Sequence, residues 1–247
     1  LAGDDRCVLG PDDDALMAAL VKLIFLCRRR EDLTPAAYAL RLLGGHVPIA
    51  LRHHPTLRKY VVNIVEQTGP GLVPIDSIGE LSFDSLEDFR ERLYDSPEGE
   101  RIVGQDVAGF MGGAHGYVTT EYVQKAGAPP VGRGERSAGV KLIGPVRRRP
   151  DMSHAAFVDH WLGTHVPLAL AHHPGLTKYV TNVVEQPLGA GAESWDGFAE
   201  LYFASEADRQ TRMFASAESE RVIRADMAQF IGTTGGYLAA EYVQKVP

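Results

Sequence analysis

The strongest constraint on this chain is that its second half repeats its first. Residues 21–24 (Val-Lys-Leu-Ile) return as residues 140–143, and residues 121–125 (Glu-Tyr-Val-Gln-Lys) return as residues 241–245. The offset grows from 119 to 120 residues within one loop, so a single residue separates the two copies in length. A repeat of this size is a whole small domain and far exceeds a solenoid unit. The pattern therefore predicts a fused dimer, with any pocket inside or between the halves.

The repeat divides the 247 residues into four segments. We expect a flexible leader over 1–17, a first repeat over 18–125, a linker rich in Gly, Ala and Pro over 126–139, and a second repeat over 140–247. An apolar content of 45% is enough for two hydrophobic cores.

Charge and composition exclude several classes of function. The net charge of -7 argues against nucleic-acid partners and against anionic membrane surfaces. No stretch approaches the roughly 20 apolar residues of a membrane span, and the acidic leader lacks the positive region of a secretory signal. Cys7 and Cys27 form no metal or redox motif. A reduced, cytoplasmic protein is the simplest interpretation.

Each repeat shows the pattern β-α-β-β-α-α-β. In the first copy the strands are expected over 20–26, 58–67, 79–83 and 116–125. The first helix is expected to begin at Thr34-Pro35 and to end near Gly44, and Ser85 and Ser96 cap the later helices. This order is a split βαβ, ferredoxin-like α+β half. Helices cover one face of its sheet, so two halves can pack sheet against sheet and close a barrel whose interior is the natural pocket.

Short motifs in both copies resemble the EthD family of the dimeric α/β-barrel superfamily. The motifs are His46-Val-Pro48 and Pro55-Thr-Leu-Arg-Lys-Tyr60-Val in the first copy, and Phe157-Val-Asp-His-Trp161, His165-Val-Pro167 and Pro174-Gly-Leu-Thr-Lys-Tyr179-Val in the second. The resemblance implies two tandem ferredoxin-like repeats that form an intramolecular pseudo-dimeric barrel. It also implies a pocket for an apolar, often cyclic molecule, without fixing the reaction. The first copy departs from the pattern at Arg41 and Leu42.

Histidines next to proline are the first candidates for chemistry. His165 and His46 are expected just past a helix end, where an imidazole could act as acid or base or could instead cap helix carbonyls. His160 is expected either in solvent or at the pocket mouth. Trp161 and Phe157 share one helix face and are expected as pocket wall or core.

The second strand of each copy alternates two sets of side chains. Asn182 and Asn63 lie on one face, and Tyr179 and Tyr60 lie on the other. Either type could bind a substrate oxygen or could simply fill the core and satisfy backbone groups. Glu121 and Glu241, in the last strands, are expected to pair with cations across the sheet.

Paired histidines invite a metal hypothesis that we reject from the sequence. His54 and His173, each preceded by another His, have no Asp, Glu or Cys at helpful spacing, whereas zinc needs three or four ligands. Turn or pocket-rim roles are expected for them, and we predict no metal and no bound cofactor. The arginine runs at 28–30 and 147–149 are expected to be solvated rims or anion sites.

Three functions remain open. The first is a cofactor-independent lyase, cyclase or isomerase acting on an apolar cyclic ketone or polyketide-like molecule. In it His165 and His46 would move protons, and Asn182 and Tyr179 would hold an oxygen. Seven further side chains would contact substrate: Trp161, Phe157, His160, Tyr60, Asn63, and the pair His173 and His54 at the rim. The alternatives are a cofactor-free monooxygenase of an electron-rich phenol or quinol, and a non-enzymatic carrier or accessory protein. A further homodimer of the fused pseudo-dimer stays open.

Overall fold

The computed structural model describes residues 20–128 and 132–247, and the predicted leader over 1–17 lies outside them. Both halves have the predicted order of elements. The first half contains β1 (Val21–Arg29), α1 (Pro35–Leu40), η1 (Arg41–His46), α2 (Val47–His53), β2 (Lys59–Thr68), β3 (Ser77–Phe83), α3 (Leu86–Arg90), α4 (Pro97–Ala108) and β4 (Met111–Lys125). The second half contains β5 (Val140–Arg148), α5 (His154–His160), η2 (Trp161–His165), α6 (Val166–His172), β6 (Leu176–Leu188), β7 (Gly197–Phe203), α7 (Glu206–Arg212), α8 (Ala217–Phe230), β8 (Ile231–Thr234) and β9 (Tyr237–Lys245).

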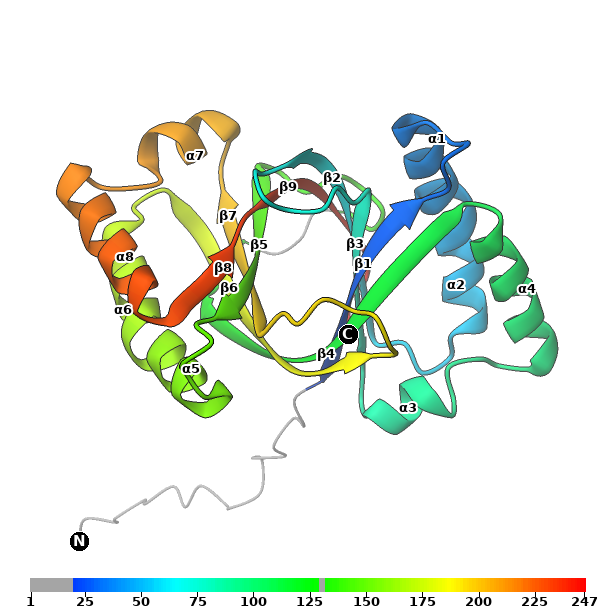
Figure 1. Ribbon diagram of the computed structural model, residues 1–247. Helices are drawn as coiled ribbons and strands as arrows, with labels where there is room; N and C mark the ends of the chain where they lie inside the picture. The colour runs from blue at the N-terminus through cyan, green and yellow to red at the C-terminus, as the bar shows by residue number, and fades with distance from the viewer. Residues whose placement is uncertain (1–19, 129–131) are drawn as a thin grey trace, which may run out of the picture.

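The strands close into one antiparallel barrel shared by the two halves (Figure 1). The order around it is β7-β6-β4-β1-β3-β2-β9-β5, and β5 pairs with β7 to complete the ring, while β8 lies beside β5. The halves join along two seams, β4 with β6 and β2 with β9. Helices of each half pack outside on opposite sides. The expected pseudo-dimeric α/β barrel is therefore confirmed.

N-cap residues with hydroxyl side chains determine where the helices begin. Thr34 accepts a hydrogen bond from the Ala37 amide, and Ser153 does the same for Ala156. Such caps satisfy backbone donors that the first turn leaves without partners. The later helices use the predicted Ser85 and Ser96 caps. Among the described residues, no helix is long and apolar enough to cross a bilayer.

The first helix of each half continues past the predicted end at Gly44. It passes through a π-helical segment, η1 or η2, and runs on to His53 or His172. The Val47 amide bonds back to the Leu42 carbonyl, one residue further than in an α-helix. Pro48 lacks an amide hydrogen, which favours a local widening over regular α-helical bonding. His46 and His165 consequently lie inside a helical run, and the expectation of a position past a helix end is wrong.

Three hydrophobic clusters occupy the two faces of the barrel sheet. Two of them fill the spaces between the helices and the outer face, around Tyr38 and Phe110 in the first half and around Trp161 and Phe230 in the second. The third plugs one end of the barrel interior with residues that include Ile24, Ile143 and Phe198. The remainder of the interior combines apolar side chains such as Val61 and Val243 with buried charged ones, and these charges make it the unusual part of the fold.

Candidate functional site

His46 and His165 each face a carboxylate on the last helix of their own half. His165 Nδ1 lies 2.7 Å from Asp226 Oδ2, and His46 Nδ1 lies 2.9 Å from Asp106 Oδ2. All four residues are buried. A carboxylate at Nδ1 favours the tautomer that carries its hydrogen there and its acceptor at Nε2. Each pair is therefore a proton acceptor of fixed orientation.

One position on the first helix holds different residues in the two halves, and each of them contacts the aspartate of its own half. His160 Nε2 lies 2.9 Å from Asp226 Oδ1, and at the matching position the Arg41 guanidinium contacts Asp106 Oδ1. The His160 side chain is 20% exposed and lies at the helix surface. The substitution between the copies therefore preserves a third member of the cluster while exchanging a guanidinium for an imidazole.

Burial keeps both histidines in their neutral form. Desolvation lowers the pKa of His165 and of His46 below the ordinary value for histidine, and the hydrogen bonds to Asp226 and Asp106 only partly oppose this effect. A neutral imidazole accepts a proton at neutral pH, whereas an imidazolium cannot. Both rings are thus in the state that a general base requires.

The aromatic residues around these pairs fill the space between helices and sheet. Trp161, Phe157 and Tyr179 are at most 1% exposed. Trp161 occupies room that Gly197 leaves, because a Cβ on Gly197 would overlap its ring. The first half has Leu42 and Ser77 at the matching positions, and the Ser77 hydroxyl lies 2.7 Å from the Tyr38 hydroxyl. The two cores therefore diverged by compensating exchanges of size and polarity.

A surface hollow of about 560 Å³ lies beside the cluster of the first half. Its lining is mostly apolar and includes Leu33, Leu40 and Gly45, with the Arg41 side chain at its edge. His46 and Asp106 do not line the hollow, but Arg41, which does, contacts Asp106 and so connects the hollow with the pair. In the second half the residues matching Leu40, Gly45 and Gly109 are Asp159, Thr164 and Gln229, which are larger or more polar.

A second site lies inside the barrel, across the sheet from the histidines. The Lys22 ammonium contacts Glu80 (2.7 Å), Glu121 (2.7 Å) and Glu200 (2.6 Å). The matching Lys141 contacts Glu80 (2.5 Å), Glu200 (2.8 Å) and Glu241 (3.1 Å). The pattern follows the pseudo-twofold symmetry of the repeats. The prediction that Glu121 and Glu241 pair with cations is confirmed.

Mutual attraction keeps this buried network ionised. Burial alone lowers the pKa of Lys22 and Lys141, but the surrounding glutamates raise both values well above the ordinary range. Burial likewise raises the pKa of Glu200, and the two lysines more than reverse the effect. Glu80, Glu121 and Glu200 bring carboxylate oxygens within 4.8 Å of one another. The Lys22 ammonium contacts all three, so a side chain already occupies the place that a metal cation would take.

The sheet separates the predicted site residues into two groups. Asn63 and Asn182 belong to the barrel interior, where each amide donates to a glutamate, Glu80 at 2.7 Å and Glu200 at 2.8 Å. Within the described residues, the Oδ1 atoms of both Asn side chains have no hydrogen-bond partner. Tyr60 and Tyr179 lie on the opposite face, in the helix–sheet cores. One bound ring therefore cannot contact both Asn182 and His165.

His54 and His173 lie at the ends of the helical runs. The Nδ1 atom of His54 lies 3.1 Å from the Leu93 carbonyl, and His173 makes the matching contact with the Met213 carbonyl. Burial lowers the pKa of both rings. Each ring thus fastens the helical run to the segment before the last helix of its half.

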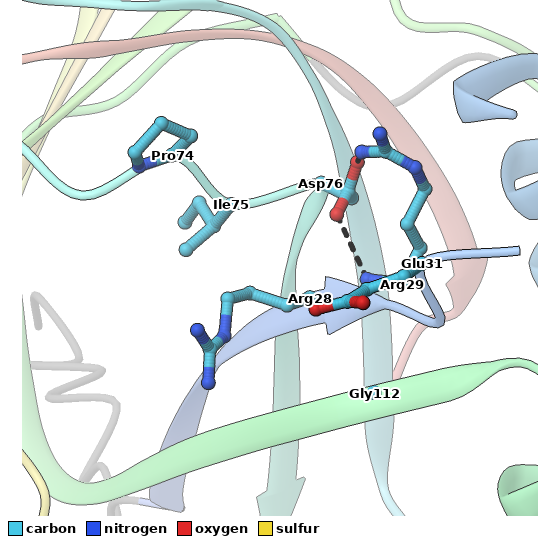
Figure 2. Close-up of a pocket in the computed structure, with 7 residues that line it drawn as sticks. All are labelled: Arg28, Arg29, Glu31, Pro74, Ile75, Asp76 and Gly112. Atoms are coloured by element: carbon cyan, nitrogen blue, oxygen red, sulfur yellow. Dashed lines mark hydrogen bonds and ion pairs between the residues drawn. The ribbon is translucent and has the colours of Figure 1, made fainter. Parts of the chain in front are cut away.

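The arginine runs end the first strand of each half. Arg28 and Arg29 are the last residues of β1, and the Arg29 amide and guanidinium both bond to Asp76 (Figure 2). A hollow of about 270 Å³ lies here, and Arg28 points away from the Arg29–Asp76 pair. Arg148 and Asp196 repeat the pair in the second half. The paired arginines fasten the β2–β3 and β6–β7 loops.

Sequence reasoning anticipated Glu121 and Glu241 but missed the other carboxylates and the lysines that define the two sites. Asp106 and Asp226 lie about 60 residues from their histidines, and no local pattern links them. Lys22 and Lys141 did carry a signal, because each interrupts an otherwise apolar strand at the repeat offset. Glu80 and Glu200 recur in the same way. Charged residues that recur inside buried strands indicate a polar interior.

The fold places the protein in the class of dimeric α/β barrels. Here the two halves of the barrel come from one chain. The EthD domain model matches residues 30–114 and 149–234. The chain belongs to the EthD domain family, with two tandem copies of the domain. No curated protein matches the chain.

Three solved structures share the fold over nearly the whole length. A protein described as anthrone oxidase-like has 12% identity and a TM-score of 0.63, covering 92% of this chain and 94% of its own. A protein from Lactobacillus acidophilus, provisionally described as a monooxygenase, has 9% identity and a TM-score of 0.54, with coverage of 93% and 98%. A third from Fusobacterium nucleatum, described in the same way, has 7% identity and a TM-score of 0.56, with coverage of 92% and 94%.

Proposed function

We propose that the protein is a cofactor-independent monooxygenase of an electron-rich phenol, quinol or anthrone. The observation that carries this proposal is the pairing of a neutral, buried His with a buried Asp in each half. Removal of a proton turns such a substrate into an anion that can reduce oxygen without a cofactor. One oxygen atom enters the ring, and the other leaves as water with two hydrogens from the substrate.

His46 and His165 take the role of base in this proposal. Asp106 and Asp226 orient the rings and stabilise the imidazolium that forms. The apolar hollow beside Arg41 offers an aromatic ring a place next to the first pair, and the Arg41 guanidinium can attract the anion formed there. In this proposal, the predicted substrate contacts of Trp161, Phe157 and His160 are made next to the His165–Asp226 pair.

Oxidation has more support than the alternative chemistry. The descriptions of three proteins with this fold name an anthrone oxidase-like protein and monooxygenases. The lyase, cyclase or isomerase hypothesis would use the same histidines, but none of these descriptions names such a reaction. A non-enzymatic carrier would have no need for a base of fixed tautomer.

Oxygen consumption tests the proposal directly. Purified protein is mixed with a panel of anthrones and quinols in an oxygen electrode, with the His46→Gln/His165→Gln double variant alongside. We expect uptake without added cofactor and a loss of about 10²- to 10⁴-fold in the variant, the usual contribution of a general base. His172→Gln is the matched control, because His172 bonds Ser219 and not the Asp226 cluster. Absence of uptake across the panel, or full turnover by the double variant, would refute the proposal.

A further inference from the structure

Tyr202 occupies a place in the barrel whose counterpart in the other half has no ring. Its side chain lines a hollow of about 480 Å³ at the mouth of the barrel. The Tyr202 hydroxyl lies 2.8 Å from Glu241 Oε2 and 3.0 Å from Glu200 Oε2. The ammonium groups of Lys141 and Lys178 lie 5.0 Å and 4.5 Å from the ring centroid. Two cations and two carboxylates thus hold one phenol ring.

The repeat supplies the same four groups a second time. Tyr202 pairs across the sheet with Lys141 and Lys178, and in the first half Ser82 pairs with Lys22 and Lys59. Glu80 and Glu121 match Glu200 and Glu241. Ser82 is small, so the ring is missing while its partners remain.

Ser82 itself is buried and is not among the residues that line the hollow, but most of the groups around it are. Three of the four matching groups, Lys59, Glu80 and Glu121, line it. Among residues 20–128 and 132–247, the carboxylate oxygen nearest to Lys59 Nζ belongs to Glu121 and lies 3.6 Å away, so the ammonium is only loosely engaged. The position that Tyr202 fills in the second half is thus held in the first half by the small side chain of Ser82, next to charged groups that line the hollow.

We propose that a phenol or another hydroxylated aromatic ring binds in the barrel next to Ser82. We call this place the Ser82 subsite, and its charged groups are Lys22, Lys59, Glu80 and Glu121. The ring takes the position of Tyr202 under the pseudo-twofold symmetry, against the ammonium groups of Lys22 and Lys59. Its hydroxyl donates to Glu121 or Glu80, as the Tyr202 hydroxyl does to Glu241 and Glu200. The subsite is independent of the proposed monooxygenase reaction, because the sheet separates it from the histidines.

The same carboxylates determine the form in which the phenol binds. Burial, together with Glu200 and Glu241, raises the pKa of Tyr202, so its hydroxyl stays protonated and donates. A phenol next to Glu80 and Glu121 meets matching negative charges and binds in its neutral form. The subsite thus holds a phenol, whereas the neutral histidines across the sheet would ionise one.

The probe for the test is 4-nitrophenol, whose ionised form absorbs visible light. Titration of the full chain near neutral pH is expected to show one site at which visible absorbance falls on binding, whereas a phenol ionised at the histidines would not lower it. Ser82→Tyr rebuilds the arrangement of the second half and is expected to abolish this site. Tyr202→Ser opens the second position and is expected to raise the stoichiometry from one to two. Tyr202→Phe keeps the ring in place and is expected to leave the stoichiometry at one.

Each variant can overturn the proposal. Unchanged binding by a folded Ser82→Tyr protein refutes it, and so does a Tyr202→Ser protein that gains no site. If Ser82→Tyr fails to fold, the stoichiometry of Tyr202→Ser decides. Binding that disappears in the His46→Gln/His165→Gln variant places the phenol at the helix face and also refutes the barrel subsite. A protein that binds 4-nitrophenol in the barrel but consumes no oxygen with the anthrones and quinols contradicts only the proposed reaction.

Discussion

Replacement of Lys141 by methionine tests whether the buried ionic network is a unit. Lys141 Nζ lies within 3.1 Å of carboxylate oxygens on Glu80, Glu200 and Glu241, and its side chain is 1% exposed. Methionine keeps the bulk of the side chain and removes the charge, which leaves buried carboxylates with one lysine among them. Removal of one partner from a buried pair costs about 3–5 kcal/mol. For a chain of this size, that corresponds to a melting temperature lower by about 6–20 °C.

The measurement is urea unfolding followed by tryptophan fluorescence, with Lys59→Met as the matched control. Lys59 makes one 3.6 Å contact and its side chain is 27% exposed, so its loss should cost less than about 1 kcal/mol. The deficit of Lys141→Met should shrink as the pH falls, because carboxyls without a cation take up protons and lose their charge. Equal losses for the two variants, or a deficit that does not change with pH, would refute the account of a coupled network.

Three further predictions concern the helix side of the sheet. Folding lowers the pKa of His46 and His165, so the unfolded chain binds more protons below about pH 6.5. The free energy of unfolding should therefore fall as the pH drops from 7 to 5. The double variant His46→Gln/His165→Gln should show a smaller fall in urea titrations over the same range. Gly197→Ser should lower the free energy of unfolding by about 1–3 kcal/mol, because its side chain would overlap with Trp161. The double variant Gly197→Ser/Trp161→Leu should be more stable, by at least about 1 kcal/mol, than the sum of the two single losses predicts, since Ser77 and Leu42 coexist in the first half. Additive losses in thermal melts would contradict this. Asp226→Asn should lower oxygen uptake at the second pair while Asp95→Asn, which faces His53 at the surface, should not; equal effects in the oxygen electrode would argue against an orienting role.

The repeat and the polarity patterns were sufficient to predict the architecture. Two copies of β-α-β-β-α-α-β have helices on one face of each sheet, and burying the other face requires a second sheet. The prediction failed at Gly44, where a glycine suggested the end of a helix. The π-helical segment before Pro48 keeps the run intact because wider bonding accommodates the missing proline amide. The run also packs against α4, a contact that a local pattern does not contain.

The candidate sites were only partly predictable. The His and Asn residues were singled out by type and position, but strand alternation left open which face of β6 turns toward the barrel. Only the closed barrel assigned Asn182 to the interior and Tyr179 to the core. The exchange of Leu42 for Trp161 could be read in the sequence, but its compensation by Gly197 required the packed structure.

The amino-acid sequence by itself determined the duplication, the order of elements and the pairing of two halves into one fold, because these follow from local polarity and from the repeat. The tertiary structure alone decided which charges meet. Lys22 contacts Glu200 across 178 residues, and His165 contacts Asp226 across 61. Such contacts depend on barrel closure and helix packing, which bring distant residues within a few ångströms and exclude the water that would otherwise screen them.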